Sequence, residues 1–175
     1  LLLLIVVIVA VAGFAFLYNS WTQSPLPQHE GALTVEGLND EVEIIRDSYG
    51  VPHIYASNSY DLFFAQGYTQ AQDRWWQMEF ARHTGRGSLQ ELTGANDSLL
   101  STDIFIRAVG WRAAAERDLA NYDDETIGYL EAFTDGVNAY IMNRPAGSLA
   151  FEYSVLGVTG VSIEIEPWTP VDSLV

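Results

Sequence analysis

A stripe of apolar side chains, spaced three and four residues apart, most constrains how this 175-residue chain folds. The stripe comprises Tyr60, Phe63, Phe64, Gly67, Tyr68, Ala71, Trp75 and Met78. This spacing predicts one continuous α-helix, and further apolar residues occupy its other sides. Because a helix that is apolar nearly all round must be covered by neighbours, we expect it to lie at the centre of its domain. Gly85 and Gly87 are predicted to end it.

A β-hairpin is predicted directly before this helix. Residues 42–47 and 51–56 have the composition of short strands, and Ser48-Tyr49-Gly50 between them is typical of a turn. Pro52 cannot donate a backbone hydrogen bond, which favours an edge strand or a strand start for the second segment. Residues 31–38 indicate a further short strand.

Short helices are predicted after the central one. Ser88-Leu89-Gln90-Glu91 has the pattern of a capping box that opens a helix, and Gly94 is predicted to stop it. Residues 101–120 are predicted to form a single helix. Its apolar stripe comprises Ile104, Ala108, Trp111, Ala115 and Leu119.

The C-terminal third continues this helical pattern. Asp123-Asp124-Glu125 would charge the first turn of another helix, which Pro145 interrupts. Residues 161–165 are expected to form a strand. Thr169 followed by Pro170 predicts a cap and first position of one more helix.

Residues 1–18 form an apolar segment without a charged side chain. As a helix it would be about 27 Å long, close to the thickness of the hydrocarbon core of a bilayer. An uncleaved transmembrane anchor is favoured over a cleaved signal peptide and over a buried core helix. Ala10-Val11-Ala12 resembles a cleavage site, but the apolar run continues beyond it. No basic residue follows until Arg46, which predicts that the rest of the chain lies outside the cytoplasm, on the periplasmic or extracellular side.

The domain organisation follows from these segments. Residues 19–40, which include Pro25 and Pro27, are predicted to be a tether. Residues 41–175 are predicted to be the N-terminal part of a larger domain. The chain begins without Met and stops within a predicted helix, so we expect it to be a fragment.

Composition excludes several classes of function. The formal net charge is −15, and all eight basic residues are arginine. Such a surface would repel nucleic acid, so no nucleic-acid partner is expected, and it disfavours polyanionic substrates unless a local arginine pocket binds them. The absence of cysteine excludes disulfides, thiolate zinc sites and a cysteine nucleophile from this segment.

The central helix carries charged residues that must be paired if they are buried. We expect Asp73, Arg74, Glu79, Arg82 and Arg86 to form an ion-pair network with neighbouring elements. A paired-carboxylate acid–base site is disfavoured, because two carboxylates six residues apart lie on different faces of a helix.

Other candidate residues also favour structural roles. His29, His53 and His83 are scattered and do not indicate a metal site. Trp75 and Trp76 could line an apolar ligand pocket, but core packing is favoured. Four serines are interpreted as helix caps rather than nucleophiles: Ser57, Ser59, Ser88 and Ser101.

An ordered set of motifs over roughly residues 42–175 resembles the penicillin acylase family, whose members are N-terminal-nucleophile hydrolases. No single motif is decisive, but their common order is specific. The matching segments are Arg46-Asp47-x-x-Gly50-Val51-Pro52-His53-Ile54, Asp61-Leu62-x-x-Ala65-x-Gly67-Tyr68, Ala71-Gln72-Asp73-Arg74 with Gln77-Met78-Glu79, Gly85-Arg86, Glu91-Leu92-x-Gly94, Asp103, Arg107, Gly136-Val137-Asn138-Ala139 and Trp168-x-Pro170-x-Asp172.

The resemblance implies an α+β fold. The complete enzyme would be an αββα sandwich, of which this chain supplies mainly helices and a hairpin. It also implies hydrolysis of a small-molecule amide between an acyl group and an amine, by a hydrolase acting on carbon–nitrogen bonds other than peptide bonds. In that family a precursor cuts itself and frees a serine at the start of a large subunit, which would be this chain's partner. The serine's own α-amine acts as base, and backbone and asparagine donors stabilise the oxyanion.

These catalytic groups, and a glutamate that binds calcium in some members, would lie beyond Val175. The resemblance therefore assigns no catalytic, cofactor-binding or metal-binding residue to this chain, although the complete enzyme could bind calcium. Three alternatives remain open: an acylase of the acyl-homoserine lactone or cephalosporin type, an inactive family member, and a single-pass membrane protein whose acidic helical ectodomain binds a partner.

Overall fold

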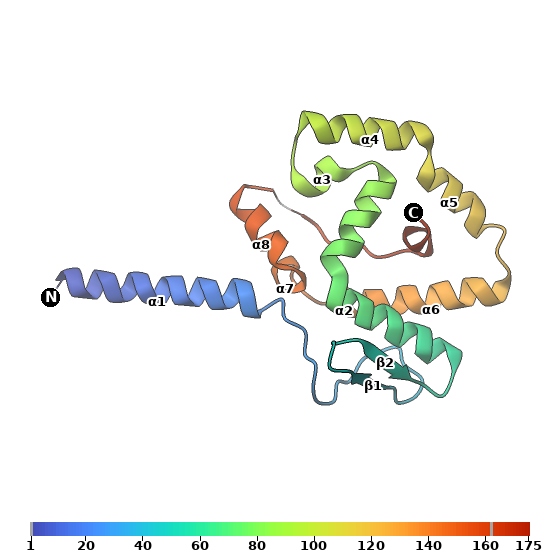
Figure 1. Ribbon diagram of the computed structural model, residues 1–175, viewed down its shortest axis with the longest axis horizontal. Coiled ribbons are helices and arrows are strands. Elements are labelled where there is room, and N and C mark those ends of the chain that lie inside the picture. The colour runs from blue at the N-terminus through green and yellow to red at the C-terminus, as the bar shows by residue number, and fades with distance from the viewer. Residues whose placement is uncertain (1, 162) are drawn as a thin grey trace.

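Helix α2 (Ser59–Arg86) lies at the centre of the body of the protein, in a computed structural model that describes residues 2–161 and 163–175 (Figure 1). The elements around it are α1 (Leu2–Gln23), β1 (Glu43–Arg46), β2 (Pro52–Tyr55), α3 (Leu89–Thr93), α4 (Asp97–Val109), α5 (Trp111–Leu119), α6 (Asp124–Ile141), α7 (Ala146–Leu149), α8 (Phe151–Val158) and the 3₁₀ helix η1 (Pro170–Ser173). The described part is mostly helical with one two-stranded sheet, as predicted.

The boundaries of α2 follow from its sequence. The Asn58 side chain accepts a hydrogen bond from the Asp61 backbone N–H and caps the first turn. Gly87 ends the helix in the left-handed conformation, with φ of 65°, whereas Gly85 lies inside it. At Arg74 the backbone leaves helical geometry (φ −139°, ψ 21°), and this kink divides the helix. One helix was predicted, but the kink was not.

Helices α2 and α6 cross in very close contact. A Cβ atom built on Gly67 would lie 2.0 Å from the carbonyl oxygen of Phe133, and one built on Gly136 would lie 1.9 Å from that of Phe64. Each helix therefore presents a glycine to the backbone of the other, and the crossing brings the core side chains of both helices together.

The main core lies on the C-terminal side of this crossing. It is formed by buried residues of α2, α3, α6, α7, α8 and the segment before η1. They are Ala71, Trp75, Met78, Leu92, Val137, Tyr140, Ile141, Leu149, Ala150, Tyr153 and Trp168. Burial of so many aromatic rings against one helix confirms the central position expected for α2.

Strands β1 and β2 pair antiparallel, with Ile44 opposite Ile54, which confirms the predicted hairpin. The further strand expected over residues 31–38 is wrong, since the described part of this segment has no strand. Gly37 adopts a left-handed φ of 108° there. Directly after this segment, the Asp61 carboxylate accepts the backbone N–H groups of Asn39 and Asp40 at 2.9 Å and holds the chain against the start of α2.

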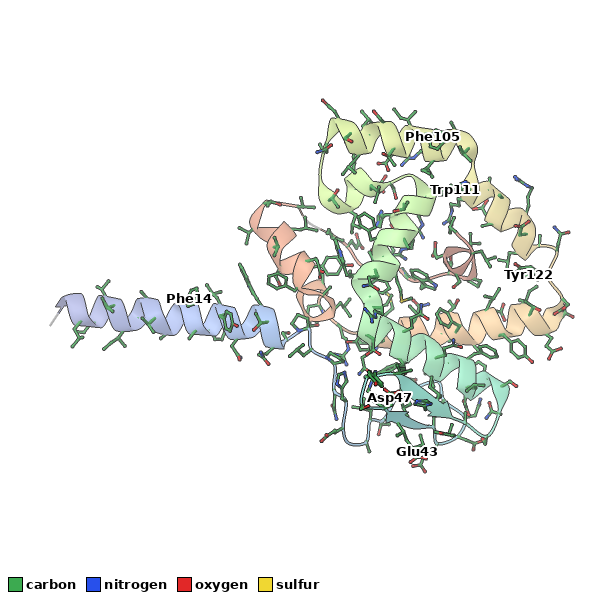
Figure 2. All side chains as sticks on the ribbon, viewed as in Figure 1. Phe14, Glu43, Asp47, Phe105, Trp111 and Tyr122 are labelled. Atoms are coloured by element: carbon green, nitrogen blue, oxygen red, sulfur yellow. The ribbon has the colours of Figure 1, made fainter. Side chains whose placement is uncertain are left out.

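The helix predicted over residues 101–120 is two helices. Asn96 caps α4 four residues earlier than expected, and Gly110, with φ of 79°, separates α4 from α5. The predicted apolar stripe is mostly wrong: Ile104 and Trp111 are exposed, and the buried side of α4 presents Asp103 and Ile106. Phe105 and Trp111 accordingly lie on these outer helices (Figure 2).

The C-terminal elements partly match their predictions. Thr169 and Asp172 form a capping box at η1, with Pro170 at its first position, as expected. Helix α8 was not predicted. The strand expected over residues 161–165 includes Ser162, which lies outside the described residues, and its neighbours Val161 and 163–165 have no regular structure.

Helix α1 extends away from the rest of the protein (Figure 1), and its side chains are exposed from Leu4 to Asn19, whereas Trp21 and Thr22 are half-buried. It continues to Gln23, five residues into the segment expected to be a tether. Within the described residues it is the one helix that is long and apolar enough to cross a membrane by length and composition. The same properties fit a signal sequence.

Candidate functional site

The first polar site joins the hairpin to the kink of α2. The Arg46 guanidinium donates two parallel hydrogen bonds to the Asp73 carboxylate, Nη1 to Oδ2 at 2.7 Å and Nη2 to Oδ1 at 2.8 Å. Arg46 also donates to the Gly50 carbonyl and to the Gln72 side chain. Such a bidentate pair fixes both position and orientation, so it holds the hairpin against the middle of α2.

The hairpin turn is organised by a second acidic side chain. The Asp47 carboxylate accepts the backbone N–H groups of Val51 at 2.9 Å and Tyr49 at 2.8 Å. These hydrogen bonds, first that of Val51, lower the pKa of Asp47. His53 lies 3.7 Å from the same carboxylate on the exposed surface. These contacts describe a turn held by a carboxylate rather than a reactive site.

A buried ion-pair cluster lies at the C-terminal end of α2. Arg82 has no exposed surface, and it pairs with Glu79 one turn earlier. Its Nη1 donates to the Pro167 carbonyl at 3.1 Å and lies 3.9 Å from Asp172 Oδ2. The guanidinium also lies over the rings of Trp75 and Trp168, at 5.7 and 5.3 Å from their centroids. Arg82 thus joins α2 to the segment before η1.

Asp172 is the carboxylate on which this cluster converges. It accepts the Thr169 hydroxyl at 2.7 Å and backbone N–H at 2.9 Å. Arg86 donates to it at 2.8 Å and Arg112 of α5 at 3.1 Å. The capping box of η1 therefore supplies the counter-charge for arginines of two other helices.

The predicted network is divided between these two places. Glu79, Arg82 and Arg86 do share one cluster, as expected. Asp73 pairs instead with Arg46, and Arg74 is exposed and has no ion pair with any described residue. Arg74 lies at the kink of α2 and its side chain is exposed, so the rule that buried charges must be paired does not apply to it.

Partners from distant segments were not predicted. The W-x-P-x-D motif and the Thr169 cap indicated a helix start, but nothing in the sequence indicated that the Asp172 carboxylate would face Arg86 and Arg112. Arg112 carried no motif signal at all. Glu166, which accepts a hydrogen bond from Arg86 at 2.6 Å, was likewise missed.

His83, Ser88 and Glu79 form a buried cluster with the composition of a hydrolytic relay. His83 Nδ1 lies 2.8 Å from the Ser88 hydroxyl, and Nε2 lies 3.5 Å from Glu79. Ser88 is buried, and it lines neither of the two cavities described below. Because a nucleophile must reach its substrate, this arrangement is structural and fixes the turn between α2 and α3.

None of the four serines predicted to cap a helix makes a side-chain capping hydrogen bond. Asn58, not Ser57 or Ser59, caps α2, and the Ser57 hydroxyl donates to Asp40 instead. Ser101 lies inside α4 and donates to the Asp97 carbonyl. Ser88 precedes α3 without a side-chain capping bond, because its hydroxyl contacts His83.

Trp75 and Trp76 belong to the core. Trp75 is buried, and its indole N–H donates to the Tyr153 hydroxyl at 2.9 Å. Trp76 packs edge-on against Tyr153. Neither residue lines the two cavities, so the interpretation as core residues fits the structure better than an acyl pocket.

Two cavities flank the crossing of α2 and α6. The first, of about 900 Å³, lies between residues 33–37, the start of α2 and the end of α6, where the Tyr60 hydroxyl donates to Asp135. The second, of about 650 Å³, lies between α2, α6 and η1 and includes Arg74. Among the described residues no three His, Asp or Glu side chains gather in a geometry that could hold a metal ion.

We expect acid to destabilise the cluster around Asp172. Burial alone would raise the pKa of Asp172, but hydrogen bonds from Thr169 and Arg86 lower it overall, and Arg86 also lowers the pKa of Glu166. Carboxylates whose pKa is lower in the folded state stabilise it above their unfolded pKa of about 4, and that stability is lost as the pH falls through the folded value.

The measurement is the thermal unfolding temperature of the protein from the full-length gene between neutral and acidic pH. The fall of the unfolding temperature with pH should be shallower in Asp172→Asn, because asparagine has no carboxylate that takes up a proton in acid. An equally steep fall in the variant would show that other groups govern acid sensitivity.

The motif residues therefore make contacts between elements. Arg46, Asp73 and Asp172 do so as described above. Asp103 accepts the backbone N–H groups of Leu89 and Gln90 at the start of α3. The Asn138 side chain bonds both the N–H and the carbonyl of Trp168. These contacts hold the helical scaffold in one geometry; they do not form a reactive site.

The sequence profile of the penicillin amidase family matches residues 41–175. Among curated proteins, the chain is 36% identical over 152 residues to penicillin acylase 2 proenzyme from Pseudomonas sp. (strain SE83), covering 87% of this chain and 18% of that protein. It is 34% identical over 140 residues to penicillin G acylase from Escherichia coli, covering 78% of this chain and 16% of that protein. It is also 32% identical over 167 residues to the acyl-homoserine lactone acylase QuiP from Pseudomonas fluorescens (strain Pf0-1), covering 94% of this chain and 20% of that protein.

A solved structure is similar as well. The thermostable penicillin G acylase from Alcaligenes faecalis aligns with a TM-score of 0.65 at 32% identity, covering 76% of this chain and 68% of the solved chain. The present chain thus spans a fifth or less of the length of the three curated relatives, but most of that solved chain.

Proposed function

The chain belongs to the penicillin amidase family, and we propose that it is the N-terminal part of an acylase that hydrolyses the amide between an acyl group and an amine. The observation that supports this proposal most strongly is the family match over residues 41–175. The motif residues in this range form one continuous scaffold from Arg46 to Asp172. A scaffold segment of this kind supports a nucleophile that lies elsewhere in the protein.

The proposed chemistry uses a serine at the start of a second, downstream chain. Its hydroxyl attacks the amide carbonyl while its own α-amine takes the proton. The protonated amine product leaves, and water then hydrolyses the acyl ester and restores the serine. Backbone and asparagine donors would stabilise the oxyanion in both steps. The complete enzyme would have the αββα fold, and any calcium site would lie in the same downstream part.

Maturation by cleavage is supported by the relatives. One of them is named a proenzyme, and this chain covers only 18% of it. The same chain covers 68% of the solved penicillin G acylase chain, which is therefore several-fold shorter than that proenzyme. A small subunit released from a longer precursor accounts for both figures.

Two classes of substrate, with different acyl groups and amines, fit the relatives equally well. Relatives named penicillin acylase and relatives named acyl-homoserine lactone acylase are similarly identical to this chain, at 34–36% and 29–34%. Either substrate is a small amide.

Helix α1 is proposed to attach the enzyme to the membrane, with residues 41–175 outside the cytoplasm. Its described side chains are exposed and apolar up to Tyr18, as a lipid-facing helix requires. A cleaved signal sequence is the alternative, and it would leave the same domain in the same compartment.

The experiment is intact mass and N-terminal sequencing of the product of the full-length gene. Two chains, the larger beginning with Ser, Thr or Cys, are the expected result, and the N-terminus of the smaller chain shows whether α1 is retained. Amine release from a penicillin and from an N-acyl homoserine lactone then distinguishes the two substrate classes, with the nucleophile replaced by alanine as the control. A single stable chain without hydrolysis of either would favour a partner-binding ectodomain or an inactive family member.

A further inference from the structure

The outer side of α8 is apolar, which the scaffold contacts do not explain. Phe151, Val155 and Val158 follow one another at four- and three-residue steps, so they lie on one side of the helix. Their exposed fractions are 44%, 42% and 70%. The opposite side lies in the core, since Tyr153 is buried and its hydroxyl accepts the Trp75 indole N–H. A helix that is apolar on both sides is expected to be covered on both.

This part of the surface also lacks the charges that most of the chain carries. Charged residues make up 18% of the sequence, but Glu152 is the one charged residue among positions 145–161. Without lysine or arginine, and in a chain of net charge −15, this surface is unsuited to an acidic protein or to anionic headgroups. It suits an apolar or zwitterionic partner.

Helix α8 lies where α1 joins the body of the protein (Figure 1). The two helices are in contact. The side chains of α1 are exposed from Leu4 to Asn19, whereas Trp21 and Thr22 are half-buried, so the contact lies at the end of α1 nearest the body. If α1 crosses a bilayer, Tyr18 and Trp21 lie at the depth of the headgroups, where such aromatic rings are favoured. Helix α8 then lies beside the same bilayer surface.

We propose that Phe151, Val155 and Val158 of α8 insert into the bilayer surface beside α1 and form a second membrane contact, with zwitterionic lipid. This inference rests on the part of the proposed function that places α1 in the membrane. Insertion of one apolar helix face among the headgroups is the binding mode of interfacial helices. A second contact would fix the orientation of the body relative to the membrane, which a single helix followed by a tether does not.

The absence of cysteine from this chain allows one reporter to be placed on this face. Val158→Cys puts a thiol on α8. Val109→Cys puts a matched thiol on α4, where Val109 is 50% exposed and lies away from α1 (Figure 1). Both variants are made in the full-length gene and labelled with bimane, and the parent protein is labelled in parallel to subtract downstream cysteines. The proteins are reconstituted in phosphatidylcholine vesicles with and without a lipid that carries a nitroxide on its acyl chain.

We expect the nitroxide lipid to reduce the bimane fluorescence at position 158 about three-fold or more, and that at position 109 far less, because an interfacial helix reaches the acyl chains. Weak quenching by the lipid at position 158 would overturn the proposal, whether aqueous iodide reaches the label or another part of the protein covers it. Equally strong quenching at both positions would also overturn it, because α8 would then have no special place at the membrane.

The apolar character of the face is tested in the Val158→Cys background. Val155→Leu keeps it and should preserve quenching by the lipid, whereas Val155→Asp introduces a charge and should reduce the quenching at position 158 about two-fold or more. Because Val155 is exposed, neither change disturbs the core. Unchanged quenching in Val155→Asp would overturn insertion of this face.

Two measurements on the same samples separate this proposal from the proposed function. N-terminal sequencing shows whether α1 is retained, and amide hydrolysis tests the acylase independently of lipid quenching. With α1 retained, an unquenched label at position 158 overturns the contact of α8 alone. If α1 is removed and the protein stays in solution, the anchor and this contact both fail, while hydrolysis still decides the acylase activity.

Discussion

Replacing Gly136 by alanine is expected to destabilise the protein by about 3 kcal/mol or more, because the added methyl group would meet a backbone rather than a movable side chain. Its Cβ would lie 1.9 Å from the Phe64 carbonyl oxygen and 2.9 Å from the Tyr68 backbone nitrogen. Relief of this contact requires α2 and α6 to separate, and separation would open the core that both helices share.

Gly128 provides a matched control in the same helix. A Cβ built there meets nothing within 4 Å, so Gly128→Ala should be neutral or stabilising by about 0.5–1 kcal/mol through helix propensity. The measurement is the denaturant midpoint and soluble yield of the full-length protein. Equal midpoints for the two alanine variants would show that the close crossing of α2 and α6 is not present.

The crossing also shows where prediction from the sequence stops. Gly67 belongs to the apolar stripe that correctly predicted α2, and Gly136 belongs to a recognised motif. Periodicity gives the face on which a residue lies, but not which residue of a distant helix lies opposite. The meeting of these two glycines depends on the angle and register of two helices, which are tertiary properties.

Errors in the local predictions have a similar origin. The strand expected over residues 31–38 is interrupted by Gly37, which adopts a left-handed φ of 108°. The helix expected over 101–120 is divided by Gly110, which the apolar pattern alone does not detect. In both cases a single residue that contributes nothing to hydrophobic periodicity decides the outcome.

The sequence predicted that a buried ion-pair cluster would form on α2, but not which residues would belong to it. Charged residues on a buried helix must be paired, and this rule correctly anticipated the cluster around Arg82. Which carboxylate would pair with which arginine was not predictable, because Asp73 and Asp172 receive partners from segments far away in sequence. The kink at Arg74 additionally removed one member from the expected set.

The family motifs of this chain therefore specify assembly rather than chemistry. Arg46 with Asp73, the two glycines, Asn138 with Trp168, and Asp172 with its arginines each join two elements. The catalytic serine that we propose for a downstream chain could be positioned only if this scaffold keeps its shape. Substitutions at these residues should then lower the amount of folded enzyme before they change its substrate preference.

Replacing Arg82 by methionine should produce a loss of about 3–5 kcal/mol, because it leaves the buried Glu79 carboxylate without its guanidinium partner. Both side chains are fully buried, and the arginine also bonds the carbonyls of Glu166 and Pro167. Methionine approximates the volume of the arginine stem, so the loss reports the charge and the hydrogen bonds more than a cavity.

Two further variants separate these terms, each measured by denaturant unfolding of the full-length protein. Glu79→Gln combined with Arg82→Met removes the isolated charge and should recover part of the loss, which makes the double variant less unstable than the sum of the singles. Glu91→Gln breaks an exposed pair with Arg107 and should cost about 1 kcal/mol or less. If Arg82→Met cost no more than Glu91→Gln, the buried cluster would not hold α2 to the segment before η1. The anchoring of Asp172 would then have to come from Arg86 and Arg112 alone.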